Sequence, residues 1–131
     1  MKETEQLIRE YFDAFNRHDA EGLLATLSDD VVHDINEGPT EVGIEAFRRF
    51  KAHMDETYRE QITDLAVMVS GERGAAEFTC SGEYLKTDGP LPEAKGQRYS
   101  ILAAAFFTVR GGKIVRVTSY YNLAAWTTAI S

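Results

Sequence analysis

Apolar residues recur at spacings of three and four in three stretches of the first half of the chain, and this pattern predicts amphipathic helices. The first predicted helix covers residues 4–17. The second is short: it begins after Asp19, a residue type that favours helix N-caps, and continues to about Leu27. The third begins after Gly43 and extends to about Tyr58.

The period of the apolar residues changes to two from Ile62 onward, as expected for β-strands. Turns that contain glycine, at residues 71–74 and 111–112, separate successive long strands. The remaining predicted segments are a turn at 28–30, a short strand at 31–35, a polar loop at 36–40, long strands at 75–86, 98–110 and 114–121, a proline-containing loop at 87–97 and a helical tail at 122–130. Helices grouped apart from an antiparallel meander favour an α+β fold, with three N-terminal helices packed on a curved, mainly antiparallel sheet.

The 131 residues contain no repeat and no linker, so a single domain spanning residues 1–131 is expected. The strand predicted at 98–110 is apolar on both faces. An antiparallel sheet commonly exposes one face to water. We therefore expect a second copy of the chain to cover the outward face, so that the protein forms a homodimer through the sheet.

The formal net charge is −7, from 14 lysines plus arginines and 21 aspartates plus glutamates. This charge argues against nucleic acid and against an anionic membrane as partners, because both attract basic surfaces. The single cysteine, Cys80, can form no internal disulfide and is expected to be an inert buried thiol. No signal peptide and no apolar run of roughly 20 residues is visible, which favours a cytoplasmic protein.

Four local strings, taken with the order of the elements, carry a resemblance to a known family. They are YFDAFNRHD in the first helix, LSDDVVHD before the polar loop, VGIEAFRRF at the start of the third helix and GGKIVRVTSYYNL near the end. The chain resembles the SnoaL-like and ketosteroid isomerase-like branch of the NTF2-like superfamily over nearly its whole length. The resemblance implies an α+β cone with a deep pocket for a small apolar molecule, often in a dimer. Isomerases, cyclases, epoxide hydrolases, dehydratases and binding domains share this fold, so the fold leaves the activity open.

The resemblance also implies roles for individual residues. Tyr11 matches the tyrosine that donates a hydrogen bond to a developing oxyanion in ketosteroid isomerases. The aspartate base of those enzymes matches Ile35 when counted forward without a gap, and Asp34 when counted back from Gly43. Asp34 is preferred, because a deletion of one residue at a strand end is tolerated easily. The protonated acid of the isomerase site has no counterpart in residues 103–105, which are alanines, and this argues against steroid isomerase activity.

Asp34 and Tyr11 are therefore the candidate catalytic residues, and each has a plainer interpretation. A carboxylate that faces an apolar cavity has a raised pKa and can remove a proton next to a carbonyl, but Asp34 could instead cap a turn together with Asn36. Tyr11 could be a core tyrosine. His33 precedes Asp34 and should point to the opposite face of the strand. The candidate pocket residues are His33, Asn36, Tyr84, Tyr120 and Trp126.

The histidines lack the spacing of a metal site, and no dinucleotide-binding, phosphate-loop or nucleophile-elbow motif occurs. We therefore expect no metal and no cofactor. The leading hypothesis is a cofactor-independent isomerase or lyase that abstracts a proton from an apolar carbonyl compound. The alternative is a non-catalytic binding domain for a hydrophobic metabolite. A third hypothesis is epoxide hydrolase-like activation of water, for which the predicted strands lack an Asp-Arg-Asp arrangement.

Overall fold

A computed structural model describes residues 3–131 of the chain, so the first two residues of the predicted domain lie outside the described part. Four helices and six strands follow one another in a simple order. They are α1 (Thr4–Asn16), α2 (Ala20–Leu24), β1 (Leu27–Ile35), β2 (Thr40–Val42), α3 (Ile44–Thr57), β3 (Tyr58–Ser70), β4 (Arg73–Tyr84), β5 (Arg98–Arg110), β6 (Lys113–Tyr121) and α4 (Leu123–Ala129).

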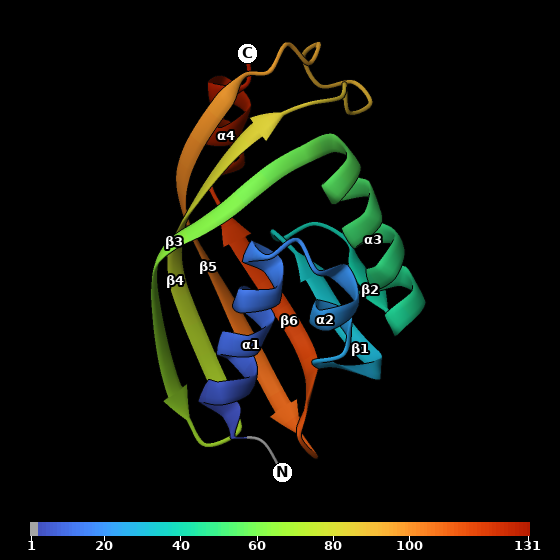
Figure 1. Cartoon of the computed structure of the whole chain (residues 1–131), viewed down its shortest axis with the longest axis vertical. Coiled ribbons are helices and arrows are strands. Elements are labelled where there is room, and N and C mark those ends of the chain that lie inside the picture. Colours follow the sequence, from blue (N-terminus) through green and yellow to red (C-terminus); the bar gives the residue numbers. More distant parts are fainter. Residues whose placement is uncertain (1–2) are drawn as a thin grey trace.

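The six strands form one curved sheet in the order β2-β1-β6-β5-β4-β3, which contains the predicted meander of four antiparallel strands (Figure 1). Strand β1 pairs with β6 in the parallel direction and with β2 in the antiparallel direction. Helices α1, α2 and α3 lie in front of the sheet in Figure 1, and α4 lies near the loop that joins β4 to β5. We call the face that α1 and α3 cover the inner face, and the opposite face the outer face.

Helix α1 packs on the inner face because its apolar residues form one stripe. Leu7, Ile8 and Phe12 of this stripe are almost fully buried. The helix can approach β4 closely because position 74 is a glycine: a Cβ added at Gly74 would lie 2.3 Å from the Cδ1 atom of Ile8. The predicted N-cap of the second helix is confirmed, since the Asp19 side chain accepts a hydrogen bond from the backbone N–H of Gly22 at 2.9 Å.

The structure differs from the predicted elements mainly around β1 and β2. Strand β1 begins at Leu27, so the turn predicted at 28–30 is wrong. Asp29 and Asp30, which suggested the turn, lie in the part of β1 from Leu27 to Val32 where its pairing with β6 changes register. Such irregular pairing accommodates residues that are typical of turns. The polar loop at 36–40 ends in β2, which is too short to be recognised from its own three residues. The predicted tail forms α4, capped by the Asn122 side chain.

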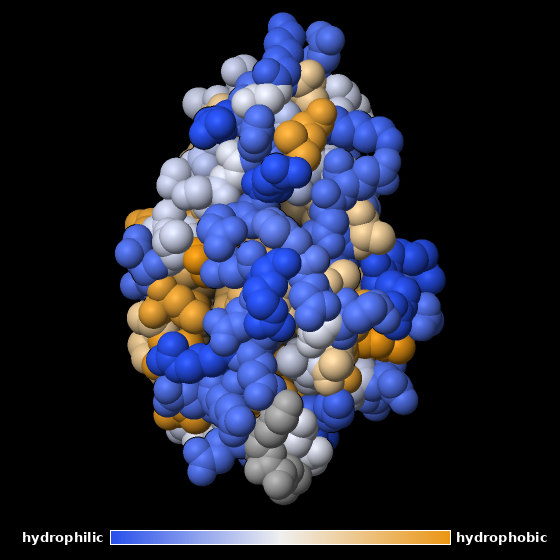
Figure 2. Space-filling model, in the orientation of Figure 1, coloured by the Kyte–Doolittle hydropathy of each residue, from blue (hydrophilic) through white to orange (hydrophobic). Residues whose placement is uncertain are grey.

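The outer face exposes several large apolar side chains. Leu102 is 76% exposed, and Phe106 and Tyr120 are also exposed. The helix-covered side in Figure 2 is mostly hydrophilic, with apolar areas chiefly along the edge over β3 and β4. No helix within residues 3–131 is long and apolar enough to cross a membrane.

Candidate functional site

A cavity of about 420 Å³ lies between the inner face of the sheet and helices α1 and α3. Its helical walls are formed mainly by aromatic and apolar side chains. They come from Tyr11, Phe12 and Phe15 of α1 and from Phe47, Phe50 and Met54 of α3. We call this space the central cavity. A largely apolar cavity with a few polar groups is the usual form of a small-molecule site.

Tyr11, which the resemblance to ketosteroid isomerases implied as a site residue, lies in the wall of the central cavity. Its ring contacts Phe12 and Phe107 edge-on, with centroid distances of 5.2 and 5.3 Å. Burial raises the pKa of Tyr11, so the hydroxyl stays protonated. Among the described residues none forms a hydrogen bond with this hydroxyl, which leaves it available as a donor to a bound molecule.

His33 also faces the central cavity, where its imidazole is packed between aromatic rings. The ring centroid lies 4.5 Å from that of Phe47 and 4.8 Å from that of Phe50. Burial lowers the pKa of His33 to about 4, although the charge of Asp34 opposes the shift. The Nδ1 atom is buried and finds no hydrogen-bond partner within the described part of the chain. The His33 imidazole in the cavity wall is therefore neutral at neutral pH.

Asp34 points to the outer face, so the expectation that it faces the cavity is wrong. Its carboxylate accepts hydrogen bonds from Thr118 at 2.7 Å, Thr40 at 2.8 Å and Arg116 at 2.8 Å. These bonds hold the pKa of Asp34 below its usual range, against the opposing effect of burial. The expected raised pKa is wrong for the same reason. Side chains alternate along a strand, and on β1 the inward position belongs to His33.

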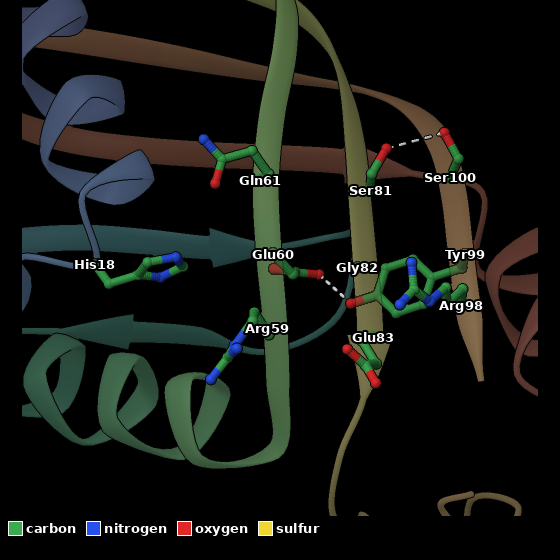
Figure 3. A pocket seen from close by; sticks show the side chains of 10 residues that line it. All are labelled: His18, Arg59, Glu60, Gln61, Ser81, Gly82, Glu83, Arg98, Tyr99 and Ser100. Carbon is green, nitrogen blue, oxygen red and sulfur yellow. Dashed lines mark hydrogen bonds between the residues drawn. The ribbon is translucent and has the colours of Figure 1, made fainter. Parts of the chain in front are cut away.

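The central cavity contains a carboxylate that the sequence did not reveal, that of Glu60 on β3. Strand pairing places Glu60 opposite Gly82 and Gly82 opposite Tyr99, so the three residues form one row across the sheet. Because Gly82 has no side chain, the Tyr99 ring lies over it, and its hydroxyl donates a hydrogen bond to the Glu60 carboxylate (Figure 3). Burial and then the charge of Glu60 raise the pKa of Tyr99. The carboxylate is thus fixed by a tyrosine that remains protonated.

A second hollow, of about 500 Å³, opens beside this row and includes polar residues of the neighbouring strands (Figure 3). Arg59, Glu83 and Arg98 line it, as do Ser81 and Ser100, which are paired on β4 and β5 with their hydroxyl oxygens 3.1 Å apart. Its lining is charged and largely exposed. The central cavity is the better candidate for an apolar ligand.

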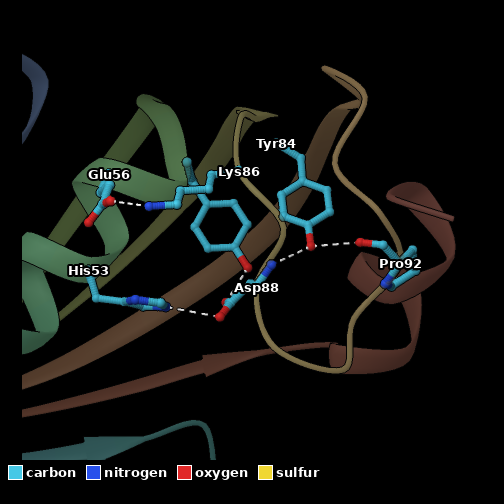
Figure 4. A network of polar contacts seen from close by, with 7 residues as sticks. His53, Glu56, Tyr84, Lys86, Asp88 and Pro92 are labelled. Atoms are coloured by element: carbon cyan, nitrogen blue, oxygen red, sulfur yellow. Dashed lines mark hydrogen bonds and ion pairs between the residues drawn. The ribbon is translucent and has the colours of Figure 1, made fainter.

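Tyr84 does not line the central cavity, which corrects its assignment as a pocket residue. It is fully buried, and its hydroxyl donates to the carbonyl of Pro92 at 2.7 Å and accepts from the N–H of Asp88 at 2.8 Å (Figure 4). The Asp88 carboxylate in turn accepts a hydrogen bond from Tyr58 at 2.6 Å and contacts the His53 ring at 3.0 Å. Tyr84 therefore orders the loop after β4, and that loop brings Asp88 to the cavity wall.

The other predicted pocket residues have mixed positions. Asn36 is structural: its side chain accepts a hydrogen bond from the backbone N–H of Tyr121 at 2.8 Å, and it does not line the cavity. Tyr120 lines the edge of the cavity, but its ring packs against Phe106 on the outer face. Trp126 lines the cavity and is nearly buried. Cys80, expected to be an inert buried thiol, is buried in the same wall, where burial and the charge of Glu60 raise its pKa.

A curved sheet, the helices on its inner face and the cavity between them give the chain the same α+β fold as an NTF2-like protein from Burkholderia pseudomallei K96243, which is 21% identical with a TM-score of 0.85 over 100% of this chain and 99% of that one. The chain belongs to the SnoaL-like domain family, whose sequence model matches residues 8–117. Within residues 3–131 no group of three or more histidine, cysteine, aspartate or glutamate side chains is placed to hold a metal ion.

Solved structures of two bacterial proteins are similar to the whole chain. A proposed polyketide cyclase from Pseudomonas putida KT2440 is 44% identical, with a TM-score of 0.98 over 100% of both chains. Another from Silicibacter sp. TM1040 is 48% identical, with a TM-score of 0.95 over 98% of this chain and 95% of that one. An LEH-like epoxide hydrolase from Mycobacterium tuberculosis shares only the fold, at 17% identity and a TM-score of 0.73 over 95% of this chain and 86% of that one. A comparison with curated proteins finds no match.

Proposed function

We propose that the protein is a cofactor-independent catalyst that removes a proton next to the carbonyl group of an apolar compound, with Glu60 as the base. The observation that carries this proposal is the presence of the Glu60 carboxylate and the unpartnered Tyr11 hydroxyl in one largely apolar cavity. Glu60 takes the catalytic role that the sequence suggested for Asp34. Tyr11 keeps its expected role.

The proposed reaction balances with these two groups alone. The Glu60 carboxylate takes a proton from the carbon next to the carbonyl, and the electron pair of the C–H bond moves to the carbonyl oxygen. The Tyr11 hydroxyl donates a hydrogen bond to this enolate oxygen. The protonated Glu60 then returns the proton to another carbon, which gives an isomer, or to an alkoxide formed when the enolate attacks a second carbonyl. A positioned acid or base contributes about 100- to 10,000-fold to such a step.

The similarity to proposed polyketide cyclases supports this chemistry. Closing a ring between two carbonyl-bearing carbons begins with the same removal of a proton. His33 is not assigned as the base, because burial disfavours the imidazolium cation that it would form on taking up a proton, whereas a protonated Glu60 is neutral and suits an apolar cavity. Water activation of the epoxide hydrolase type is disfavoured, because no arginine of the described chain lines the cavity to complete an Asp-Arg-Asp arrangement.

Deuterium exchange provides a test that does not need the natural substrate. The probe is beta-tetralone, an enolisable bicyclic ketone, and the readout is incorporation of solvent deuterium next to its carbonyl, measured by NMR. We expect the protein to accelerate the exchange, Glu60→Gln to slow it by about 100-fold or more, and Tyr11→Phe to slow it by about 100-fold.

Asp34→Asn is the matched control, because it makes the same change from carboxylate to amide on the outer face. It should leave the exchange rate unchanged. If Glu60→Gln retains the full exchange rate, Glu60 is not the base.

The second candidate function is a non-catalytic binding domain for a hydrophobic metabolite. It is favoured by the residues that β1 contributes to the cavity. These are Ile35 and His33, whose pKa is lowered by burial, and β1 provides no carboxylate that could act as a base there. Binding of beta-tetralone without any exchange above the uncatalysed rate would support this candidate.

We also propose that two copies of the chain associate through the outer face. The exposed Leu102, Phe106 and Tyr120 on neighbouring strands support this, because such apolar groups on one sheet face favour burial against a partner.

A further inference from the structure

Lys51 is a buried cation in the wall of the central cavity. It lies on the apolar stripe of α3, and 5% of the residue is exposed. Long lysine side chains usually extend their charged ends into water, but this one remains inside. Its Nζ atom lies 4.5 Å from the centroid of the Phe15 ring.

The hydrogen bonds of this ammonium group are incomplete. An ammonium group has three N–H donors. Within the described residues Lys51 donates one hydrogen bond, to the Asp55 carboxylate at 2.6 Å. The Phe15 ring face offers a second, weaker attraction. A buried donor without an acceptor is costly, so the site favours a further acceptor from outside the chain.

The other charged groups of the cavity are already committed to partners. Glu60 is held by Tyr99, and Asp88 by Tyr58 and His53. Among the described residues that line the central cavity, Lys51 is the sole lysine or arginine. The side chain of its partner Asp55 is 39% exposed, so water screens the negative charge of Asp55 more than the positive charge of Lys51.

Lys51 and Glu60 also line a small side pocket that adjoins the central cavity between α1, α3 and β3. The two side chains do not form an ion pair with each other. A molecule in the cavity can therefore contact the proposed base and the buried cation at the same time.

We propose that the ligand of the central cavity carries an anionic oxygen group, such as a carboxylate or an acidic enol, and that Lys51 binds this group. The inference rests on the proposed function and narrows its substrate class from apolar carbonyl compounds to those with an acidic oxygen. It makes Lys51 a residue that selects the ligand, while Glu60 carries out the proton transfer.

Two fluorescent probes with the same ring system test the proposal. Anilinonaphthalene sulfonate carries an anionic group, and phenylnaphthylamine lacks it. We expect the protein to bind the sulfonate at least about tenfold more tightly than the neutral amine, and each probe to displace the other. Lys51→Met should weaken binding of the sulfonate by about tenfold or more and change binding of the neutral amine by less than about twofold. Lys51→Arg should retain most of the preference.

Lys86→Met is the matched control, because it removes the same charge from an exposed side chain that pairs with Glu56. It should leave both affinities unchanged. A Lys51→Met variant that keeps the preference for the sulfonate overturns the proposal. If that variant does not fold, the wild-type protein still decides: equal affinities for the two probes overturn the proposal as well.

The probe-binding experiment and the deuterium-exchange experiment can fail separately. Failure of the Lys51 proposal leaves binding of the neutral amine and deuterium exchange in beta-tetralone intact. If the Glu60 proposal is wrong, the expected effects on deuterium exchange will not be observed, but the protein should still prefer the sulfonate probe to the neutral amine.

Discussion

His33 holds a neutral imidazole against Phe47 and Phe50 in the cavity wall. Because burial lowers its pKa to about 4, the unfolded chain binds a proton at this residue at a higher pH than the folded chain does. The free energy of unfolding is therefore unaffected by His33 above about pH 6.5 and falls as the pH drops from there toward about 4.

This linkage gives a prediction at the scale of one residue. One proton changes stability by about 1.4 kcal/mol per pH unit, so His33 should remove on the order of 3 kcal/mol from the free energy of unfolding between about pH 6.5 and 4. Urea unfolding across this range measures it. His33→Phe retains an aromatic ring but cannot be protonated. It should reduce the slope of the unfolding free energy against pH by the equivalent of up to one proton. Equal pH slopes in the two proteins would show that His33 is accessible to protons in the folded state.

Some side chains of the central cavity could be predicted from the sequence, and others could not. The resemblance to ketosteroid isomerases pointed to Tyr11, and the structure places its side chain in the cavity wall; the helical stripe alone fitted a core tyrosine equally well. Alternation predicted that His33 and Asp34 face opposite sides, but it could not say which side belongs to which residue. Glu60 was missed because its partner Tyr99 lies 39 positions away and depends on the register of three strands.

At the scale of elements, the row of Glu60, Gly82 and Tyr99 requires a glycine in β4. A Cβ at position 82 would lie 2.3 Å from the Cζ and hydroxyl atoms of Tyr99. Gly82→Ala should therefore displace the Tyr99 ring, break its hydrogen bond to Glu60 and lower the free energy of unfolding by about 1–3 kcal/mol.

A double-mutant cycle measured by urea unfolding tests this explanation. Tyr99→Phe should cost stability in the wild-type protein and much less in the Gly82→Ala background, because the bond is already lost there. Strictly additive effects would mean that the alanine does not act through Tyr99.

The loop between β4 and β5 depends on the hydroxyl of Tyr84. Tyr84→Phe leaves the carbonyl of Pro92 and the N–H of Asp88 without this partner, and should cost about 1–3 kcal/mol. Amide hydrogen exchange should show faster exchange at Asp88, with little change in the centres of β4 and β5. Tyr120→Phe is the control, because that exposed hydroxyl has no hydrogen bond within the described chain, and it should change stability by less than about 0.5 kcal/mol. An unchanged exchange rate at Asp88 would contradict the role given to Tyr84.

The helices and the four-stranded meander could be predicted because each is long enough to show its own period. Strand β2 could not, since its three residues are too few to show a period, although its partner β1 is the preceding strand of the chain. The start of β1 was also missed, because aspartates that signal a turn lie beside a shift in strand register. Local patterns thus gave the larger elements, and the pairing of strands determined the rest.

At the scale of the whole molecule, the proposed association through the outer face predicts a dimer in sedimentation velocity. Leu102→Glu places a charge in the centre of this face and should shift the protein toward the monomer, because burying an unpaired charge is unfavourable. Val42→Glu is the control, since Val42 is 65% exposed on the edge strand β2, outside the proposed interface. A wild-type protein that sediments as a monomer would contradict the proposed dimer.

Trp126, the chain's single tryptophan, lies in the wall of the central cavity, with its ring centroid 5.5 Å from that of Tyr58 and 6.0 Å from that of Tyr99. Its intrinsic emission therefore comes from the cavity alone, and light absorbed by the neighbouring tyrosines is passed on to it. A molecule that fills the cavity should change the wavelength and intensity of this emission and should protect the indole from a soluble quencher. The protein thus contains its own optical sensor of occupancy, and collections of unlabelled compounds can be screened without knowledge of the reaction.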